Sequence, residues 1–463
     1  MMKTRLEKDS LGAKAVPQKA YYGVETVRAI ENFPISGLRF HPSFIRALAV
    51  IKKSCARANL SLRKLDSRRA KAIIRACDEI IRGKWHDQFV TDALQSGAGV
   101  SAHMNANEVI ANRALEILGK KRGNYGYLHS HDHVNMGQST NDVIPTAIRL
   151  GALYLLNDFY RASAELEKAF LRKAVQFRKV VKTGRTHLQD AAPITLGQEM
   201  SGWARQIEKA RVRVKRLAEN LLELGIGGSA VGTGLNTTLR YRRKVIAFLR
   251  QESKMPVRSA KNLFEVMQSD VDMAALSGGL RDYALCLVQI SNDLRLLSSG
   301  PQTGLAEIRL PARQPGSSIM PGKINPVMPE VTAQTAFQVI GNDLSVAFAA
   351  SSGQLELNVM RTVIAYNLLQ SIELLKNVAH ALGKHCITGI EADEDRCFEY
   401  AERSFGIAAA LNPYIGYSKA AECVKEACRK GKTLREVVLE KELLTPAQLN
   451  RILSPENLTK PKN

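Results

Sequence analysis

The chain has 463 residues, more than one simple core usually organises, and 45% of them are hydrophobic but only 6% aromatic. Its formal net charge of +22 comes from basic residues spread along the chain. Without a recognisable nucleic-acid-binding module, that charge favours a solvated surface, or attraction of small anions, over a nucleic-acid or membrane partner.

The apolar runs and the cysteines indicate which broad classes of protein, such as membrane, secreted or zinc-binding proteins, are not expected. No run of about 18 apolar residues exists, so we expect no membrane-spanning helix. The N-terminus MMKTRLEKDS lacks the apolar core of a signal peptide. The seven cysteines are scattered and form no CxxC pair, which predicts a reduced, cytoplasmic protein without a zinc site.

Taken in chain order, the first 40 or so residues show no period and are expected to be irregular. Residues 42–60 have one apolar helical face, and residues 66–83 read as a helix from an Asp66 or Ser67 cap to Gly83. Long helical segments follow at 144–177, 195–224, 271–298, 326–351 and 359–388, and shorter ones fill the last seventy residues. This pattern predicts an all-α fold around a bundle of long helices.

Three polar segments interrupt these helices: HSHDHVNMGQSTNDVIP (129–145), KTGRTHLQDAAPITLGQE (182–199) and GSSIMPGKIN (316–325). A single Ser, Thr or Asn beside a helix is explained by capping, and a lone serine in a Gly-Pro loop by a turn. QSTND, however, places five polar residues in a row. Hydroxyls and amides together with one lysine form a lining that suits the carboxylates of a small anion.

These segments carry a family resemblance. GSSIMPGKINP resembles the signature of the aspartase/fumarase superfamily, and MGQSTND and TGRTHLQDAAPITLGQE resemble its two other active-site stretches. The similarity spans the chain and is strongest to the aspartate ammonia-lyases, as in INPVMPEV and GQLELNVM. It implies a three-domain all-α fold with domains at 1–140, 141–393 and 394–463. It also implies a homotetramer with a common helix core, in which each active site combines loops of three subunits.

The resemblance implies reversible anti-elimination of ammonia from L-aspartate to give fumarate, through an aci-carboxylate intermediate. No metal and no cofactor is expected to be required, with Mg²⁺ at most an activator. Ser317 matches the family's base, and Lys323 and backbone N–H groups would stabilise its alkoxide. Lys323 and Asn325 match the pair that holds the α-carboxylate, and Ser318 adds a hydrogen bond to the β-carboxylate.

The other two loops supply the rest of the expected site. Thr186 and His187 match residues on its opposite side, where His187 would handle the departing amine, oriented by Glu330. A structural histidine is the alternative for His187. Arg28 matches a family arginine near the site, or is an ordinary ion-pair residue. Three further residues match those that line the substrate pocket, with hydroxyls facing the β-carboxylate and the amide facing the amino group: Ser139, Thr140 and Asn141.

Several positions depart from the family pattern. Val100 stands where the family has threonine, which removes a hydrogen bond worth about 1–3 kcal/mol if its partner stays unpaired. His103 replaces asparagine, and Ser130 and His131 replace a Pro-Asn pair in HSHDH, whose histidines leave a metal site as an alternative. A fumarase-like hydratase of malate and fumarate, and a catalytically weakened homologue, therefore remain as alternatives to an aspartate lyase.

Overall fold

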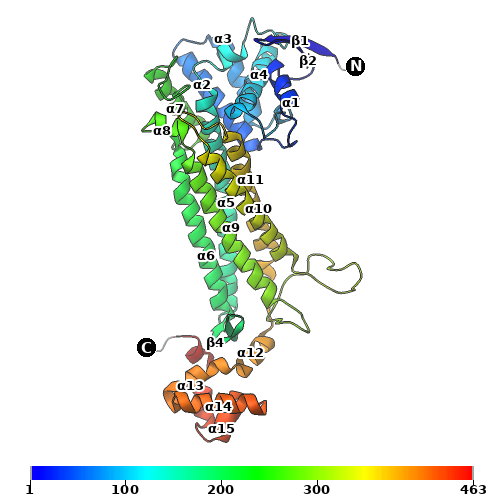
Figure 1. Cartoon of the computed structure of the whole chain (residues 1–463), viewed down its shortest axis with the longest axis vertical. Helices are drawn as coiled ribbons and strands as arrows, with labels where there is room; N and C mark the ends of the chain where they lie inside the picture. Colours follow the sequence, from blue (N-terminus) through cyan, green and yellow to red (C-terminus); the bar gives the residue numbers. More distant parts are fainter. Residues whose placement is uncertain (1–2, 461–463) are drawn as a thin grey trace. The chain divides into compact units, whose positions relative to one another are not determined.

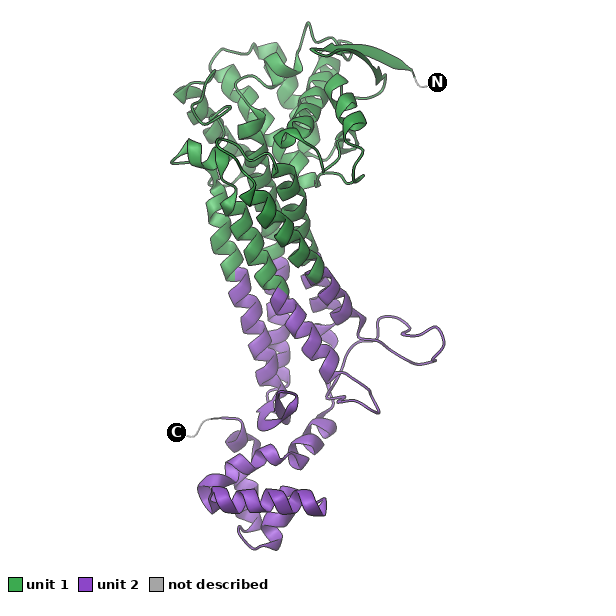
Figure 2. Ribbon diagram, in the orientation of Figure 1, with its two compact units in different colours: residues 1–160, 212–284, 337–376 green, residues 161–211, 285–336, 377–463 purple. Residues whose placement is uncertain are grey.

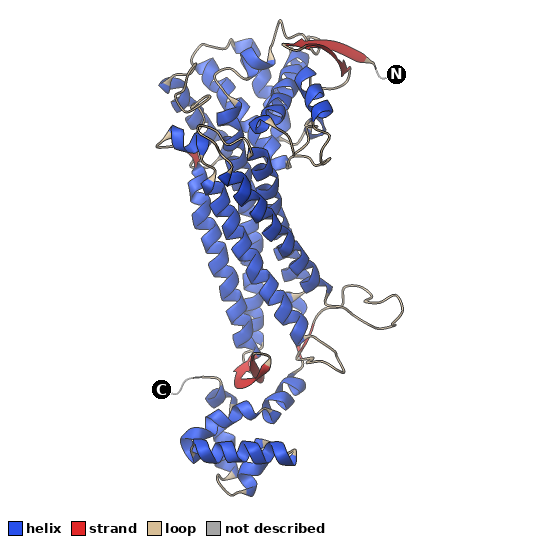
Figure 3. Cartoon of the chain, in the orientation of Figure 1, coloured by secondary structure: helices blue, strands red, loops and turns tan. Residues whose placement is uncertain are grey.

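The computed structural model describes residues 3–460, and most of them lie in α-helices (Figure 3), which confirms the expected all-α class. The chain divides into two compact units. One unit comprises residues 1–160, 212–284 and 337–376, and the other comprises residues 161–211, 285–336 and 377–463 (Figure 2). The three-domain division expected from the resemblance stays a prediction.

The N-terminal segment is not irregular, so that expectation was wrong. Strands β1 (Thr4–Asp9) and β2 (Gly12–Pro17) form an antiparallel hairpin, and helix α1 (Val24–Asn32) follows. The hairpin gives no apolar alternation because most side chains on its inward face are charged, such as Arg5 and Glu7, while Val16 is the buried apolar residue of β2.

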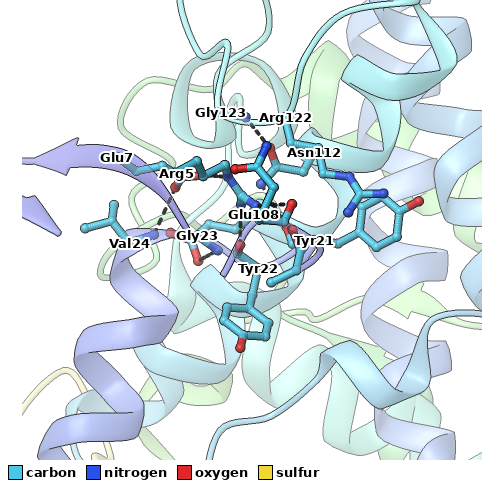
Figure 4. A network of polar contacts seen from close by, with 12 residues as sticks. Arg5, Glu7, Tyr21, Tyr22, Gly23, Val24, Glu108, Asn112, Arg122 and Gly123 are labelled. Carbon is cyan, nitrogen blue, oxygen red and sulfur yellow. Dashed lines mark hydrogen bonds and ion pairs between the residues drawn. The ribbon is translucent and has the colours of Figure 1, made fainter. Parts of the chain in front are cut away.

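A polar network ties this segment to helix α4 (Val100–Ile117), as Figure 4 shows. The buried carboxylate of Glu108 accepts hydrogen bonds from the backbone N–H of Gly23 at 2.8 Å and from that of Thr26 at 3.1 Å. Asn112 donates to the carbonyl of Tyr21 at 2.8 Å. The carboxylate thus satisfies N–H groups at the start of α1 that have no partner within the helix.

The next helices agree with the sequence pattern. Helix α2 (Pro42–Ser61) has proline at its first position and His41 as its cap. Helix α3 (Ser67–Ile81) is capped by Asp66, which accepts from the N–H groups of Arg68 and Arg69. Both confirm the helices expected there. Short turns connect α3 to α4 and α4 to the next helix: His86–Gln88, Gly97–Gly99 and the π-helical Ser130–Val134.

Five long helices dominate Figure 1 and confirm the long segments expected from periodicity: α5 (Thr140–Gln176), α6 (Leu196–Ala218), α9 (Val271–Leu297), α10 (Val327–Ser351) and α11 (Arg361–His385). In the first unit α5 packs on α9 through the rings of Phe159 and Tyr283, 5.0 Å apart. In the second unit α5 packs on α6 through Phe170 and Trp203, 5.9 Å apart.

Short elements complete the fold. Helices α7 (Leu239–Ser253) and α8 (Leu263–Gln268) belong to the first unit. The remaining strands form three two-stranded pairs: β3 (Val181–Thr186) with β4 (Gln189–Thr195), β5 (Glu223–Leu224) with β6 (Arg258–Ser259), and β7 (Ile308–Arg309) with β8 (Glu391–Ala392). The first and third pairs are antiparallel, and the second is parallel.

The C-terminal helices are short, as expected, and enclose a small core that includes Leu411, Val437 and Leu449. They are α12 (Glu394–Arg403), α13 (Ala408–Ile415), α14 (Tyr417–Lys430), α15 (Leu434–Glu440), α16 (Pro446–Ile452) and α17 (Pro455–Leu458). Across the described residues, no helix combines the length and the apolar character needed to cross a membrane.

Gly23 leaves no room for a side chain at the network of Figure 4. A Cβ there would lie 2.5 Å from Glu7 Oε2, 2.6 Å from the Tyr125 hydroxyl and 2.8 Å from Glu108 Cδ. We expect Gly23→Ala to lower the free energy of unfolding by about 1–3 kcal/mol because buried groups must move apart. Denaturant unfolding measures this. Gly202→Ala, in open space on α6, is the matched control and should not destabilise.

Candidate active site

The QSTND segment begins helix α5 with a reciprocal pair of caps. Ser139 Oγ accepts from the backbone N–H of Asn141 at 3.2 Å, and Asp142 Oδ1 accepts from the backbone N–H of Ser139 at 3.0 Å. This is a variant of the capping box, in which Ser139 accepts from the second N–H of the helix and not the third, and Asp takes the place of Glu. The expected binding residues Ser139, Thr140 and Asn141 therefore stand on a helix N-terminus, which favours negative charge.

Asp142 connects this helix start to the glycine-rich loop near residues 225–234. Its second oxygen accepts from the backbone N–H groups of Gly227 and Ser229, each at 3.0 Å. Burial raises the pKa of Asp142 to about 7, although these three N–H groups favour its charged form. The carboxylate therefore fixes the backbone around Ser139 from the buried side.

Two further contacts hold Asn141. Its side-chain Nδ2 donates one hydrogen to the carbonyl of Ala230 at 2.8 Å, which leaves the second hydrogen as a donor and Oδ1 as an acceptor. The buried guanidinium of Arg361 donates to the carbonyl of Asn141 at 3.1 Å and pairs with Asp270 at 3.1 Å. Arg361 and Asp270 thus position the loop without being part of its exposed face.

Thr140 is held from within by a histidine. The hydroxyl of Thr140 lies 2.8 Å from His103 Nδ1, and His103 Nε2 lies 2.6 Å from the ammonium group of Lys52. Both His103 and Lys52 are buried, and Lys52 also donates to Asn135 Oδ1 at 2.9 Å. Burial lowers the pKa of Lys52 to about 7 and, together with the neighbouring Lys52 charge, holds the pKa of His103 well below its usual value.

Val100, the first residue of α4, is 43% exposed and lines a cleft of about 760 Å³ together with Arg28, His129 and His131. Arg28 makes a two-pronged ion pair with Asp9, at 2.7 and 2.8 Å, which agrees with the ordinary ion-pair alternative for this residue. A valine in place of threonine leaves the rim of this cleft without a hydroxyl at that position.

The GRTH segment is not a loop but the tip of the β3–β4 hairpin. Thr186 pairs with Gln189, so His187 and Leu188 form the two-residue turn. Both have positive φ, 55° and 60°, which the type I′ turn of a tight hairpin requires but which non-glycine residues adopt at a cost. This strain presents the Thr186 and His187 side chains on the exposed tip.

A buried charge network anchors the base of the same hairpin. Lys182 bridges Glu199 at 2.9 Å and Glu307 at 3.2 Å, and Arg185 pairs with Glu307 at 2.8 Å. Two cations and two carboxylates balance one another, which a buried network needs in order to be tolerated. Burial raises the pKa of Glu199, the more weakly paired of the two carboxyls.

The segment 316–325 is a loop, as expected, closed by its own backbone. Gly316 N–H donates to the Lys323 carbonyl at 2.8 Å, and Asn325 Nδ2 donates to the Gly316 carbonyl at 2.8 Å. A Cβ on Gly316 would lie 2.5 Å from the Lys323 carbonyl oxygen, so only glycine fits. Ser317 Oγ accepts from the backbone N–H groups of Ile319 at 3.2 Å and Met320 at 2.9 Å.

The expected site residues are divided between the two units. Val100 and Ser139–Asn141 belong to the first unit, and the remaining ones to the second: Thr186, His187, Ser317, Ser318, Lys323, Asn325 and Glu330. No hydrogen bond or ion pair joins His187 to Glu330 in the part of the chain that the structure describes. The orientation of His187 by Glu330 stays a prediction. Residues 3–460 hold no group of three or more His, Cys, Asp or Glu side chains placed to bind a metal ion.

The buried residues that hold the three polar segments in place were not predicted from the sequence. Lys52 falls on the apolar face of α2, four residues after Leu48, and a cation at such a position signals a buried partner. Asp142 completes a Ser-x-x-Asp capping pattern visible in the sequence. The pairs of Arg361 with Asp270 and of Lys182 with Glu307 join distant segments and leave no local signal.

Comparisons with known proteins agree with the resemblance. A family described as "Lyase" matches residues 12–341, and a family described as "Fumarase C C-terminus" matches residues 407–460. Aspartate ammonia-lyase of Bacillus sp is 49% identical over 457 residues, covering 99% of this chain and 98% of that protein. The Pseudomonas aeruginosa enzyme of the same name is 50% identical over 463 residues, at 99% and 98% coverage.

A hydratase is also similar. Fumarate hydratase class II of Halobacterium salinarum is 49% identical over 456 residues, covering 98% of this chain and 97% of that protein. Among solved structures, the fumarate lyase:delta crystallin of Brucella melitensis bound to cobalt has a TM-score of 0.96 at 48% identity, covering 99% and 100% of the two chains. Class II fumarase of Schistosoma mansoni has a TM-score of 0.94 at 34% identity, with both chains fully covered.

The strained hairpin tip allows a test of its geometry. At Leu188, whose φ is 60°, we expect the Gly variant to be more stable than the Ala variant by about 1 kcal/mol, because only glycine adopts this backbone without steric cost. The order should reverse at Gly202 inside helix α6, where alanine is preferred. Thermal unfolding of the four proteins measures both differences. Equal stability of the two variants at position 188 would contradict a left-handed turn.

Proposed function

The chain belongs to the lyase family shared by aspartate ammonia-lyases and class II fumarases, and on that basis we propose that it converts L-aspartate reversibly into fumarate and ammonia. The observation that carries this proposal is the similarity to proteins named aspartate ammonia-lyase. Such relatives from Bacillus, Pseudomonas and Helicobacter are 45–50% identical across 99% of this chain. Nearly every element of the described chain is therefore shared with them.

The chemical problem is a weakly acidic proton next to the β-carboxylate of the substrate. Its removal places extra negative charge on the carboxylate oxygens, so the enzyme needs a base and donors for the developing dianion. Ser317 is the proposed base. Two backbone N–H groups already donate to its Oγ, and donors aimed at an oxygen stabilise its alkoxide form. Lys323, exposed on the same loop, supplies the positive charge.

Lys323 and Asn325 are the proposed partners of the substrate α-carboxylate. Asn325 uses one Nδ2 hydrogen to close the loop on Gly316, and its second hydrogen remains to donate to a ligand. A lysine ammonium and an amide N–H together give one charged and one neutral donor, which suits a single carboxylate. Closing the loop with the same amide couples loop geometry to substrate binding.

The β-carboxylate is assigned to the hydroxyls of Ser139, Thr140 and Ser318. The first two stand at the N-terminus of α5, where the helix dipole favours the added charge of the aci-carboxylate. The missing hydroxyl at Val100 takes away one further donor. We therefore expect this chain to depend more strongly on Thr140 than a relative with threonine at that position.

Asn141 and His187 are assigned to the amino group. One Nδ2 hydrogen of Asn141 is bound to the Ala230 carbonyl, and Oδ1 can accept a hydrogen bond from the substrate. An acceptor suits an ammonium group, which carries three N–H donors. His187, on the exposed hairpin tip, would help the departing amine. Glu330 would orient it from another subunit, since these two side chains do not pair within one chain.

The exposed apolar surface of α10 supports self-association. Phe337, Leu344 and Phe348 are 57%, 60% and 67% exposed on this helix, while Val339 and Val346 on its other side are buried. A helix with apolar residues on both sides is usually buried on both sides. We propose that a second copy of the chain covers α10, and that a homotetramer brings the three loops of each site together from three subunits.

A hydratase that interconverts malate and fumarate is the second candidate, because the Halobacterium relative of that name is as similar as the aspartate ammonia-lyases. Both reactions use side chains alone and need no organic cofactor; Mg²⁺ would act at most as an activator. We propose a cytoplasmic site of action, in agreement with the scattered, unpaired cysteine pattern.

The substrate assay decides between the candidates. Purified protein is offered L-aspartate, L-malate and argininosuccinate separately, and fumarate is followed by its ultraviolet absorbance. We expect fumarate from L-aspartate, with release of equal ammonia, and none from the other two. Fumarate from malate alone would establish the hydratase. Fumarate from none of them, in a protein that unfolds cooperatively, would leave the catalytically weakened homologue.

Shared active sites predict complementation between inactive variants. Ser317→Ala should lower turnover by about a thousandfold because it removes the proposed base, and His187→Ala should impair the same reaction. Co-expressed in one tetramer, the two variants should recover about a quarter of wild-type activity, because some sites then take both intact residues from different subunits.

Mixing two separately assembled tetramers, without subunit exchange, is the matched control and should recover nothing. Ser318→Ala, which changes the neighbouring hydroxyl, should reduce turnover much less than Ser317→Ala. No recovery after co-expression would contradict sites built from more than one subunit.

A further inference from the structure

Thr140 is connected to a buried cation through one imidazole ring. From outside to inside, the order is Thr140 Oγ1, His103 Nδ1, His103 Nε2 and Lys52 Nζ, with separations of 2.8 Å and 2.6 Å at the two hydrogen bonds. Lys52 comes from α2, His103 from α4 and Thr140 from α5, so three helices meet at this chain of contacts. The three residues lie in one unit of the structure.

We propose that Lys52, through the tautomer of His103, sets whether the Thr140 hydroxyl donates or accepts a hydrogen bond in the active site. The inference rests on the proposed role of Thr140 as a ligand of a substrate carboxylate. Lys52 and His103 are positioning residues, because neither touches the substrate. This gives a function to His103, which stands where the family resemblance predicts asparagine.

With Lys52 protonated, only one arrangement of hydrogens is consistent. An ammonium group has donors and no acceptor, so it donates to His103 Nε2 and to Asn135 Oδ1. The neutral imidazole must then carry its proton on Nδ1, which donates to Thr140 Oγ1. The Thr140 hydroxyl hydrogen has no partner within this chain of contacts, and it can donate to a carboxylate oxygen.

When Lys52 loses one proton to solvent, the arrangement can reverse. The neutral amine still donates to Asn135, and its lone pair can accept from Nε2–H of His103. The ring proton then sits on Nε2 instead of Nδ1, and Nδ1 accepts from the Thr140 hydroxyl. Only oxygen lone pairs of Thr140 would then face the site, and these repel a carboxylate.

Burial and the surrounding charges place the protonation change of Lys52 near neutral pH. Burial lowers the pKa of Lys52 to about 7, against the opposing influence of the Asp142 carboxyl. His103 stays neutral because burial and the Lys52 charge depress its pKa, with a smaller contribution from His131. The thiols of Cys55 and Cys77, which face Lys52, stay protonated because burial raises their pKa values. Carboxylate binding is therefore favoured below about pH 7 and weakened above it.

The experiment measures binding of succinate, a dicarboxylate that cannot undergo elimination, by calorimetry of the full-length protein. From about pH 6.5 to about pH 8.5, the affinity of the wild type should fall about tenfold, the loss expected for one hydrogen bond to a charged group. In His103→Asn the amide donates to Thr140 but has no second tautomer, so its affinity should change by less than about twofold.

Thr140→Val provides the second test, because it removes the hydroxyl and leaves both Lys52 and His103 in place. Its affinity should be lower than that of the wild type at about pH 6.5 and should not fall further at the higher pH. His103→Asn added to Thr140→Val should have no further effect on the pH profile. An equal tenfold loss in His103→Asn or Thr140→Val would instead assign the effect to the Lys52 charge itself, and would overturn the proposal.

The result is independent of turnover. If succinate binding follows this pattern while no fumarate forms from L-aspartate, the proposed reaction is wrong and the switch stands. If fumarate forms but the wild-type affinity for succinate is flat across the pH range, the switch is wrong and the reaction stands. Thermal unfolding of His103→Asn checks its fold, and should that variant not fold, the comparison of Thr140→Val with wild type decides.

Discussion

The exposed QSTND segment of the first unit depends on the hydrogen bonds that the buried carboxylate of Asp142 accepts. It binds the backbone N–H groups of Ser139, Gly227 and Ser229, so one side chain fixes both the start of α5 and the glycine-rich loop beside it. Arg361 adds a bond to the Asn141 carbonyl and takes its counter-charge from Asp270. The polar side chains of QSTND can face outward because their backbone is held from within.

In the second unit, backbone geometry holds the exposed polar segments in place. The hairpin tip at His187 and Leu188 uses positive φ at two non-glycine residues, and its base is held by the Lys182 and Glu307 network. The signature loop closes on Gly316, where a side chain has no space, and its own N–H groups surround the Ser317 hydroxyl. In both places local strain or the absence of a side chain leaves functional groups exposed on a rigid support.

Features with a local sequence signal could be predicted, whereas contacts between distant segments could not. Helix α2 was expected at 42–60 and spans Pro42–Ser61, because an apolar face of period 3.6 is a local signal. The β1–β2 and β3–β4 hairpins carry no such signal, since the less exposed positions of β1 and β3 are mostly polar or charged. The residues of the three loops were expected from family motifs, whereas their anchors are long-range pairs. Lys52 could have been found, because it interrupts the apolar face of α2.

Elimination of ammonia and elimination of water share the proton transfer at the β-carbon, so both reactions need the same base and the same donors for the aci-carboxylate. This accounts for nearly equal identity to a hydratase and to ammonia-lyases. The reactions differ only at the leaving group, and discrimination therefore rests on the side chains assigned to it. Asn141, the proposed partner of the leaving group, carries an acceptor in Oδ1, and an acceptor binds the fully protonated amine more strongly than a neutral hydroxyl with its single hydrogen.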